Sequence, residues 1–434
     1  MTAHPTSEVK APGTRALVLH PDIRGADRAR DPDAALAEAL ALARALPGLD
    51  LRGGEVVRLP RAHPGTLFGS GKIEELHDRI AAEDIGLVLI DGPVTPVQQR
   101  NLERALETKL LDRTGLILEI FADRARTREG VLQVELAALS YQRTRLVRAW
   151  THLERQRGGL GFVGGPGETQ IEADRRAIDE QILRLRKQLS KVARTRELHR
   201  AARRRVPFPV VALVGYTNAG KSTLFNRLTG AEVMARDMLF ATLDPTMRAV
   251  DLPGAGRVIL SDTVGFISDL PPQLVAAFRA TLEEVLEADV IIHVRDIAHP
   301  ETEAQARDVG AVMADLGVDE TRPVFELWNK TDLLPDAERA AIEARAARDA
   351  HVVAGSALTG AGLAPLFAAL GRQLDGARSP AELRLGHHEG RARAWLHEHD
   401  VVEAEDTDAD GIMLRVSWTA RQKAGFERIR GADD

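Results

Sequence analysis

The residues with the clearest chemical potential form a glycine-rich segment between a predicted strand and a predicted helix. The apolar run 209–214 leads into Gly-Tyr-Thr-Asn-Ala-Gly-Lys-Ser at 215–222, and a helical pattern follows at 223–228. Strand, G-x-x-x-x-G-K-S and helix in this order are typical of a phosphate-binding P-loop. Glycines let the backbone wrap the phosphates, and successive N–H groups with the helix N-terminus supply positive potential. The predicted nucleotide contacts are Gly215, Tyr216, Thr217, Asn218, Ala219, Gly220, Lys221, Ser222 and Thr223.

A second group of residues could hold Mg²⁺ and respond to the γ-phosphate. Lys221 would place its charge between the β- and γ-phosphates, and the hydroxyl of Ser222 can bind Mg²⁺. Asp262 ends the predicted strand 257–261, where its carboxylate can hold Mg²⁺ through water, and the amide of Gly265 can sense the γ-phosphate. The first switch needs a threonine, and spacing alone does not choose between Thr242 and Thr246.

Two further motifs select the base. Trp-Asn-Lys-Thr-Asp at 328–332 follows the predicted strand 324–327, and Gly-Ser-Ala at 355–357 follows the predicted strand 352–354. The carboxylate of Asp332 can accept hydrogen bonds from N1–H and the 2-amino group of guanine, whereas adenine offers no such pair. Buried hydrogen-bonding sites reject a ligand that leaves them unpaired, so GTP should be preferred over ATP. The predicted base contacts are Asn329, Lys330, Asp332, Ser356 and Ala357, and the four motifs together predict a GTPase with Mg²⁺ as cofactor.

The residue after Gly265 bears on the rate of hydrolysis. Many GTPases place glutamine at this position to orient the attacking water. Here the residue is Phe266, whose side chain can neither donate nor accept a hydrogen bond. We therefore hypothesise slow intrinsic hydrolysis that a partner accelerates.

The element before the P-loop has a charge and a periodicity of its own. Residues 121–206 contain 20 Lys and Arg against 10 Asp and Glu, a net charge of +10, so the remainder carries −16. Such a basic module favours a polyanionic partner, nucleic acid above all, over a merely solvated arm. Its apolar residues follow 4-3 spacing in two stretches, which predicts an antiparallel coiled-coil hairpin. They are Leu132, Leu136, Leu139, Leu146, Trp150 and Leu153, then Ile171, Ile178, Ile182, Leu185, Leu189 and Val192.

The loop that joins the two predicted helices is unusually rich in glycine. Residues 157–170 contain six glycines, more than a hairpin connection needs, which favours close backbone approach to a partner over a flexible linker. The loop also contains Phe162, Val163, Pro166 and Glu168, which suit a contact surface.

The segments on either side predict two smaller α/β units. Between 15 and 120, apolar runs at 16–20, 55–59 and 87–90 alternate with helical patterns at 32–45, 73–83 and 96–107, which indicates a largely parallel sheet. Gly-Ser-Gly-Lys at 69–72 is too short for a P-loop and follows no clear strand, so a structural turn or helix start is favoured over a second nucleotide site. Beyond 380, strand patterns at 383–385, 401–404 and 412–417 and helical patterns at 391–397 and the end of the chain indicate a small unit.

Composition limits the remaining possibilities. The chain of 434 residues has 44% hydrophobic and 28% charged residues, an ordinary globular composition long enough for several domains. Because it has no Cys, disulfides and cysteine-ligated metals are excluded. His387, His388, His397 and His399 are interpreted as surface residues rather than metal ligands. With no apolar run long enough to span a bilayer and no signal-like start, we expect a cytoplasmic, monomeric protein.

These motifs resemble the HflX-type ribosome-associated GTPases over roughly residues 15–375. The resemblance rests on Gly-Pro-Gly-Glu-Thr-Gln at 165–170 followed by Glu-Ala-Asp-Arg-Arg at 172–176, on the P-loop, on Phe-Ala-Thr-Leu-Asp-Pro-Thr at 240–246, on Asp-Thr-Val-Gly-Phe at 262–266, and on Pro-Val-Gln-Gln-Arg-Asn-Leu-Glu at 96–103. It implies that Thr242 is the switch threonine and a Mg²⁺ ligand with Ser222 and Asp262, and that Lys221, Thr242 and Gly265 act in catalysis. Phe266 is also the residue usual in the family.

The resemblance further implies binding to the large ribosomal subunit and its rRNA, hydrolysis stimulated by intact ribosomes, and separation of stalled or idle ribosomes into subunits. The tip residues that would contact rRNA are Gly159, Phe162, Gly165, Gly167 and Glu168. The tip departs from the family pattern, because Phe162-Val163-Gly164 stands where a basic pair is expected. Alternative functions are assembly of the large subunit and a nucleotide-switched RNA-binding scaffold.

The sequence thus predicts a multidomain α/β architecture. A disordered start at 1–14 precedes an N-terminal α/β domain at 15–120, and a basic helical hairpin with a glycine-rich tip follows at 121–206. A Ras-like P-loop GTPase domain at 207–376 and a small C-terminal α/β domain at 377–434 complete the chain.

Overall fold

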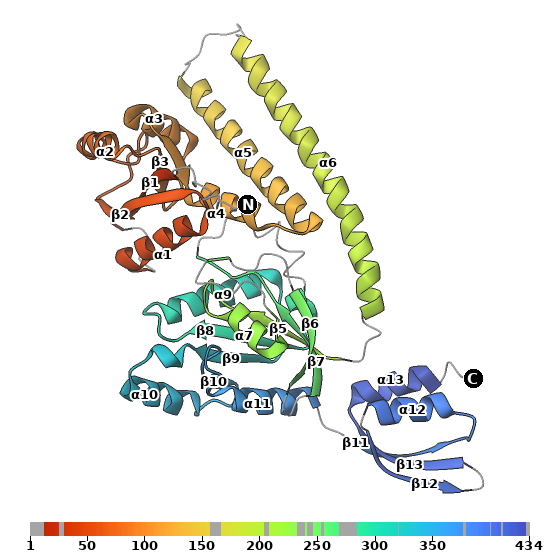
Figure 1. Ribbon diagram of the computed structural model, residues 1–434. Helices are drawn as coiled ribbons and strands as arrows, with labels where there is room; N and C mark the ends of the chain where they lie inside the picture. Colours follow the sequence, from red (N-terminus) through yellow and green to blue (C-terminus); the bar gives the residue numbers. More distant parts are fainter. Residues whose placement is uncertain are drawn as a thin grey trace, which may run out of the picture.

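The computed structural model arranges the chain in four units, shown in Figure 1. It describes residues 13–25, 30–156, 166–203, 208–231, 239–240, 246–252, 256–268, 284–319, 321–375, 379–399, 401–408 and 411–430. No helix among these residues is both long and apolar enough to cross a membrane.

The N-terminal unit is a four-stranded parallel sheet with helices on both faces. Its elements are β1 (Thr14–Ile23), α1 (Pro32–Ala45), β2 (Leu49–Leu59), α2 (Ser70–Glu83), β3 (Leu87–Ile90), α3 (Pro96–Leu106), β4 (Lys109–Asp112) and α4 (Arg113–Arg124). The strand order is β2-β1-β3-β4. Both faces of such a sheet are buried: along β1, Leu17 and Leu19 join the core containing residues of α2 and α3, while Ala16 and Val18 join the core containing residues of α1 and α4.

The hairpin consists of α5 (Arg128–Gln156) and α6 (Pro166–Arg203), which run side by side in opposite directions (Figure 1). On α6, Ile182 and Leu185 are buried, as the 4-3 pattern predicts. On α5, however, the buried residues include Val134 and Ala137, which lie outside the predicted stripe. These two residues belong to the same core as residues of α4, because α5 packs against α4 as well as against α6. The side chains of Leu146, Trp150, Leu153 and Ile171 lie outside the described residues.

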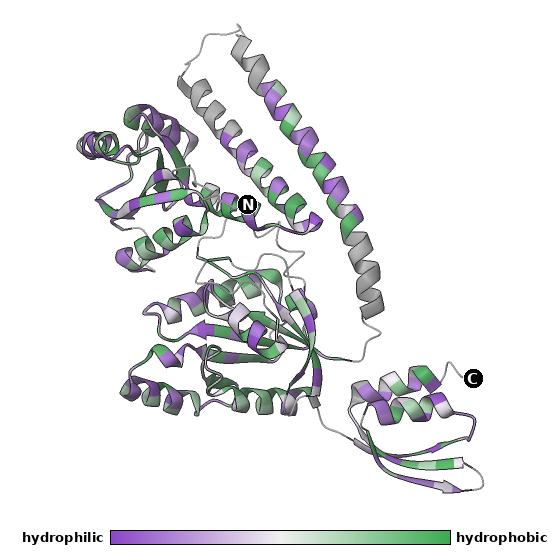
Figure 2. Ribbon diagram, in the orientation of Figure 1, coloured by the Kyte–Doolittle hydropathy of each residue, from purple (hydrophilic) through white to green (hydrophobic). Residues whose placement is uncertain are grey.

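The GTPase unit is a six-stranded sheet of order β10-β9-β8-β5-β7-β6, in which only β6 is antiparallel to its neighbour. Figure 2 shows apolar residues along its strands and polar residues on the outer faces of its helices. Its elements are β5 (Val210–Val214), α7 (Lys221–Thr229), β6 (Thr246–Leu252), β7 (Gly256–Asp262), β8 (Val290–Asp296), α9 (Thr302–Leu316), β9 (Val324–Asn329), the 3-10 helix η1 (Thr331–Leu333), α10 (Asp336–Ala346), β10 (Val352–Ala354) and α11 (Leu363–Asp375).

The C-terminal unit is a three-stranded antiparallel sheet with two helices. It comprises β11 (Ser379–Leu385), α12 (Gly390–Glu398), β12 (Val402–Asp408), β13 (Gly411–Trp418) and α13 (Ala420–Arg430), with strand order β11-β13-β12. Trp395, Trp418 and Phe426 pack together in its core. His399 stacks on Trp395, and His397 bonds to Glu405, 2.8 Å away.

The N-terminal and GTPase units share one apolar core. Phe121 at the end of α4 meets Phe240 edge to face, with ring centroids 4.6 Å apart. Residues of α1, α4 and α5 and residues of the P-loop and switch segments belong to this same buried cluster. The nucleotide-binding motifs are therefore packed directly against the N-terminal unit.

Candidate active site

The P-loop requires glycine at two positions. Gly215 has φ +150° and Gly220 has φ +98°, conformations that side chains rarely adopt. A Cβ on Gly215 would lie 2.2 Å from the carbonyl oxygen of Val294, and one on Gly220 would lie 2.2 Å from Nδ2 of Asn329. Because Gly220 is the N-cap of α7 and has no side chain, the first N–H groups of this helix remain available to an anion.

Lys221 is buried at the start of α7. Its ammonium group donates to the carbonyl oxygens of Gly215, 3.0 Å away, and of Tyr216, 2.8 Å away. Burial lowers the pKa of Lys221 to about 8, although the negative charge of Asp262 opposes this shift. A phosphate beside the ammonium would favour its charged form, so the site is suited to a polyanion.

Two oxygen ligands suitable for a divalent cation meet beside the P-loop. The hydroxyl of Ser222 on α7 donates to Oδ2 of Asp262 at the end of β7 over 2.8 Å. Asp262 is fully buried, and next to it Thr263 donates to the carbonyl of Leu213. Hydroxyl and carboxylate oxygens are the donors that Mg²⁺ prefers, so this pair fits that ion.

The segment after Asp262 is fixed to the P-loop by backbone hydrogen bonds. The amide of Phe266 donates to the carbonyl of Gly215 over 3.1 Å, and the amide of Thr217 donates to the carbonyl of Phe266 over 2.7 Å. A methyl group built on Gly265 would lie 3.1 Å from Nζ of Lys221, so Gly265 borders the candidate phosphate site. The hydroxyl oxygen of Thr217 is buried there with no hydrogen-bond partner among the described residues.

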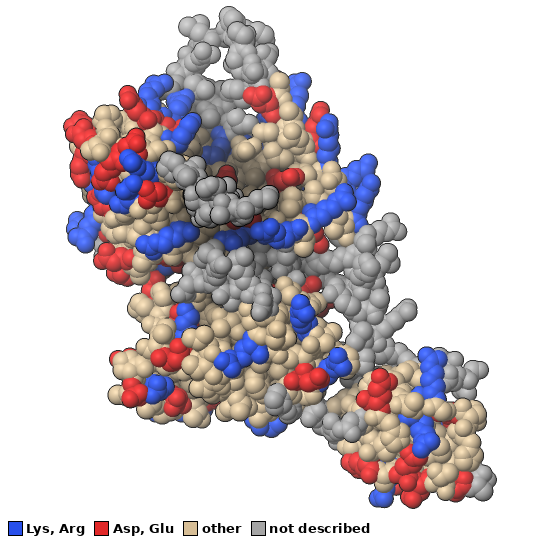
Figure 3. Space-filling model, in the orientation of Figure 1, with Lys and Arg blue, Asp and Glu red and all other residues tan. Residues whose placement is uncertain are grey.

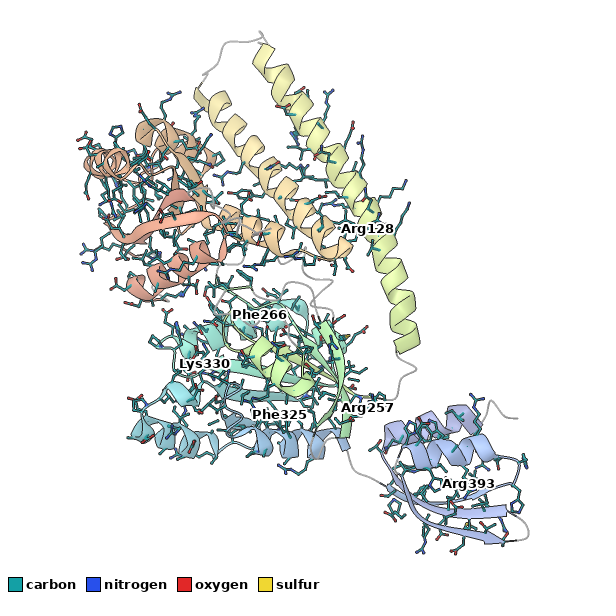
Figure 4. All side chains as sticks on the ribbon, viewed as in Figure 1. Arg128, Arg257, Phe266, Phe325, Lys330 and Arg393 are labelled. Carbon is teal, nitrogen blue, oxygen red and sulfur yellow. The ribbon has the colours of Figure 1, made fainter. Side chains whose placement is uncertain are left out.

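The side chain of Phe266 lies in the apolar core shared with the N-terminal unit. It is 2% exposed and belongs to the same cluster as Phe240, at the boundary between the two units in Figure 4. It therefore offers no group to orient a water molecule.

The residues predicted to contact the base lie close together but have different contacts. Asn329 uses both ends of its amide group within the protein: Nδ2 donates to the carbonyl of Ala219, and Oδ1 accepts from the amide of Ala357, each over 2.7 Å. Ser356 accepts from the amide of Thr359. Oδ1 of Asp332, by contrast, is buried with no hydrogen-bond partner among the described residues. Asp332 thus has the acceptor available for a base.

Lys330 and one unpredicted residue hold this region in place. Lys330 has φ +65°, and its ammonium pairs with Asp296 at the end of β8 over 2.8 Å. Arg227 on α7 was not predicted as a site residue; it donates to the carbonyls of Ala357 and Leu358. Its place near the end of the helix that follows the P-loop was the only signal available, and helix ends often carry arginine.

Some predicted residues cannot be placed. Thr242, Gly159, Phe162 and Gly165 lie outside the described residues, and Gly167 and Glu168 lie in the first turn of α6, where the side chains are not described. Asn218 adopts φ +59° within the P-loop, and Thr223 continues α7. Thr246, the other candidate for the switch threonine, begins β6.

The Gly-Ser-Gly-Lys segment at 69–72 begins helix α2. The ammonium of Lys72 pairs with two carboxylates, those of Glu55 and Glu75. A lysine held in this way is not available for a phosphate, so the helix-start interpretation agrees with the structure.

Known protein families match four consecutive segments of the chain. The family described as GTP-binding GTPase N-terminal matches residues 33–122, and that described as GTP-binding GTPase Middle Region matches 124–203. The family described as 50S ribosome-binding GTPase matches residues 210–330, and HflX C-terminal domain matches 341–434.

Individual relatives are similar over most of their length. A protein named GTPase HflX from Magnetococcus marinus is 54% identical over 360 residues, covering 83% of this chain and 82% of that protein. GTPase HflX from Escherichia coli is 47% identical over 359 residues, covering 82% and 83%. Among solved structures, the crystal structure of SsGBP and GDP complex is 24% identical with a TM-score of 0.47, covering 82% of this chain and 97% of that one.

Proposed function

Because this chain belongs to the HflX family of GTPases, we propose that in its GTP-bound form it binds the large ribosomal subunit and splits stalled or idle ribosomes into subunits. The family is a ribosome-binding one. The proposed role needs both the candidate active site, which binds the nucleotide, and the hairpin, which contacts rRNA.

In this proposal the P-loop and Lys221 bind the phosphates, and Asp332 accepts hydrogen bonds from the guanine base. Ser222 and Asp262 hold Mg²⁺, with Thr242 as the further ligand that the family resemblance implies. Mg²⁺ held there would supply positive charge that offsets the negative charge of the bound phosphates. Gly265 lies beside Lys221, where its amide can respond to the γ-phosphate.

The burial of Phe266 is the observation that carries the proposal of a ribosome-stimulated enzyme. The position that provides a water-orienting glutamine in many GTPases is here part of an apolar core. A partner must then complete the site, and we expect hydrolysis by the isolated chain to be slow. Because the ribosome completes the site, GTP is hydrolysed while the protein is bound to the ribosome.

The hairpin supplies the surface for rRNA. Arg186 and Lys187 are exposed on α6, where Arg175, Arg176 and Arg184 each pair with a carboxylate of the same helix. Figure 3 shows Lys and Arg side chains along this edge of the molecule. Phosphate contacts of this kind supply much of the affinity for nucleic acid. GTP orders the switches, binding of the ordered form provides free energy for separating the subunits, and hydrolysis releases the protein.

The test compares Lys221→Ala with Lys72→Ala, a lysine on α2 paired with two carboxylates. GTP hydrolysis is measured with and without intact ribosomes, and the mixtures are then separated on sucrose gradients. We expect the wild type and Lys72→Ala to show at least about tenfold stimulation and conversion of ribosomes to subunits. Lys221→Ala should show neither, because its P-loop lacks the ammonium.

Other outcomes separate the alternatives. Preference for immature large-subunit particles over intact ribosomes would favour an assembly role. Equal binding to RNA with GDP and with GTP would favour a scaffold. Ribosome binding by Lys221→Ala equal to that of the wild type would contradict the proposed nucleotide dependence.

A further inference from the structure

A buried polar cluster joins the N-terminal unit to the nucleotide site. It consists of Glu38 on α1 and Arg113 at the start of α4, from the N-terminal unit, and of Tyr216 and Ser268 from the GTPase unit. All four side chains are less than a tenth exposed. The cluster lies beside the apolar core that contains Phe266.

Tyr216 belongs to both regions at once. Its backbone is part of the P-loop, where its carbonyl oxygen accepts from the ammonium of Lys221 over 2.8 Å. Its hydroxyl donates to Oε2 of Glu38 in the N-terminal unit over 2.5 Å. One residue therefore connects the candidate phosphate site with the neighbouring unit.

Ser268 fixes the end of the segment that contains Gly265. Its amide donates to the hydroxyl oxygen of Tyr216 over 2.9 Å, and its carbonyl accepts from Arg113 over 2.9 Å. Its own hydroxyl lies 2.7 Å from that of Tyr216 and donates to Asp308 on α9 over 2.5 Å. With Phe266 paired to the P-loop backbone, the segment 265–268 is held at both ends.

The charges in the cluster are balanced. Burial opposes ionisation of Glu38, but Arg113 and Arg30 outweigh it and keep the pKa of this carboxyl below its usual value. Arg30 also pairs with Glu301, which precedes α9, over 3.0 Å. A charged Glu38 is the acceptor that holds the Tyr216 hydroxyl, and this hydroxyl accepts from the amide of Ser268, so the N-terminal unit helps to hold the segment 265–268 in place.

We propose that the Tyr216 hydroxyl is a positioning group that holds Gly265 beside Lys221, and that through it Glu38 and Arg113 of the N-terminal unit set the preference for GTP over GDP. Gly265 borders the γ-phosphate position, whereas the phosphates common to GDP and GTP contact the P-loop backbone. Loosening the segment 265–268 therefore weakens GTP binding and leaves GDP binding nearly unchanged. The inference rests on the proposed nucleotide site but not on the ribosome.

The test uses the full chain with Tyr216→Phe, which removes a single hydroxyl. Affinities are measured for fluorescent GDP and for a non-hydrolysable GTP analogue. We expect the GTP analogue to bind about tenfold more weakly, since a charge-assisted network is lost, and GDP to bind within about twofold of the wild type. Ser268→Ala should shift the ratio in the same direction, and the double variant should show less than the sum of the two effects.

Tyr141→Phe is a matched control, because the chain has only two tyrosines and both are bonded to a buried carboxylate. The hydroxyl of Tyr141 donates over 2.6 Å to Asp112, which lies within the N-terminal unit rather than the GTPase unit. This variant should leave the ratio of the two affinities unchanged. Equal weakening of GDP and the GTP analogue by Tyr216→Phe, or no change in either, would overturn the proposal. Failure of the wild type to bind guanine nucleotides would instead contradict the proposed nucleotide site.

Discussion

At the scale of single residues, the candidate active site contains two kinds of side chain. Some hold its loops in place, and others have an atom available to a ligand. Asn329 uses both ends of its amide on the backbone of the P-loop and of the loop at Ala357. Asp332 retains a buried oxygen with no partner among the described residues. An unpaired buried acceptor costs free energy unless a ligand satisfies it. We therefore propose that Asp332 recognises the base and that Asn329 holds the surrounding loops in place.

The first prediction follows from that buried acceptor. Asp332→Asn replaces an acceptor by a donor, so GTP affinity should fall by at least about 100-fold. Xanthosine triphosphate, whose 2-oxo group can accept from an amide, should bind the variant better than GTP does. Asp336→Asn, at the exposed start of α10, is the control and should leave both affinities as they are. Competition with fluorescent GDP measures each affinity, and unchanged selectivity in Asp332→Asn would refute the assignment.

A second prediction concerns pH. The pKa of the buried Lys221 is lowered to about 8, and bound phosphate raises it again because opposite charges favour the ammonium. Binding above that pKa must therefore take up a proton, and affinity must fall as the pH rises. We expect the Kd for GDP to increase about tenfold between about pH 7 and about pH 9. Calorimetry in buffers of different ionisation enthalpy should show the proton uptake. A Kd that stays constant over this range would mean that Lys221 keeps an ordinary pKa.

At the scale of elements, sequence periodicity predicted the helices and strands whose apolar residues follow a regular spacing. The strand 87–90 and the helix 32–45 occur within the predicted bounds, because each has a clear apolar pattern. The helix, α1, also has Asp31 as its N-cap before Pro32. Helix α4 was not predicted: all of Leu116, Ile117 and Leu118 are buried, since this helix packs on the sheet, on α5 and near the GTPase unit, and no amphipathic stripe remains. A helix that is buried on several sides has no alternation of apolar and polar faces, which is the pattern that predicts a helix from sequence.

Motifs shared with the family can also be structural. The segment 96–103 begins with a capping box between Thr95 and Gln98, and Gln98 also donates to the carbonyl of His63. Asn101 donates to the carbonyl of Gly65, and Glu103 accepts from the amide of Leu110. These polar side chains stabilise loops of the N-terminal unit. Sequence alone showed the motif but could not show this use, because the bonds to His63, Gly65 and Leu110 reach other segments of the unit.

At the scale of the whole molecule, two couplings could not be derived from the sequence. The hairpin is fixed to the N-terminal unit by Arg145, which pairs with Asp112 over 2.8 Å and contacts Gln99. The N-terminal unit is fixed to the GTPase unit by the cluster around Tyr216. Each bond joins residues far apart in the chain, for which spacing gives no information. Together they make a continuous connection from the P-loop to the base of the hairpin.

The hairpin charge gives the last prediction. Arg186→Glu with Lys187→Glu reverses two exposed charges on α6, whereas Arg348→Glu with Arg372→Glu reverses two exposed charges on the GTPase unit. If the hairpin contacts rRNA phosphates, the first pair should weaken GTP-dependent ribosome binding and reduce the slope of log K against log salt by about one for each phosphate that is no longer neutralised. Nucleotide affinity should not change, because the substitutions lie far from the P-loop. The second pair should bind ribosomes like the wild type, and an equal decrease in both variants would point to net charge rather than to the hairpin as the determinant.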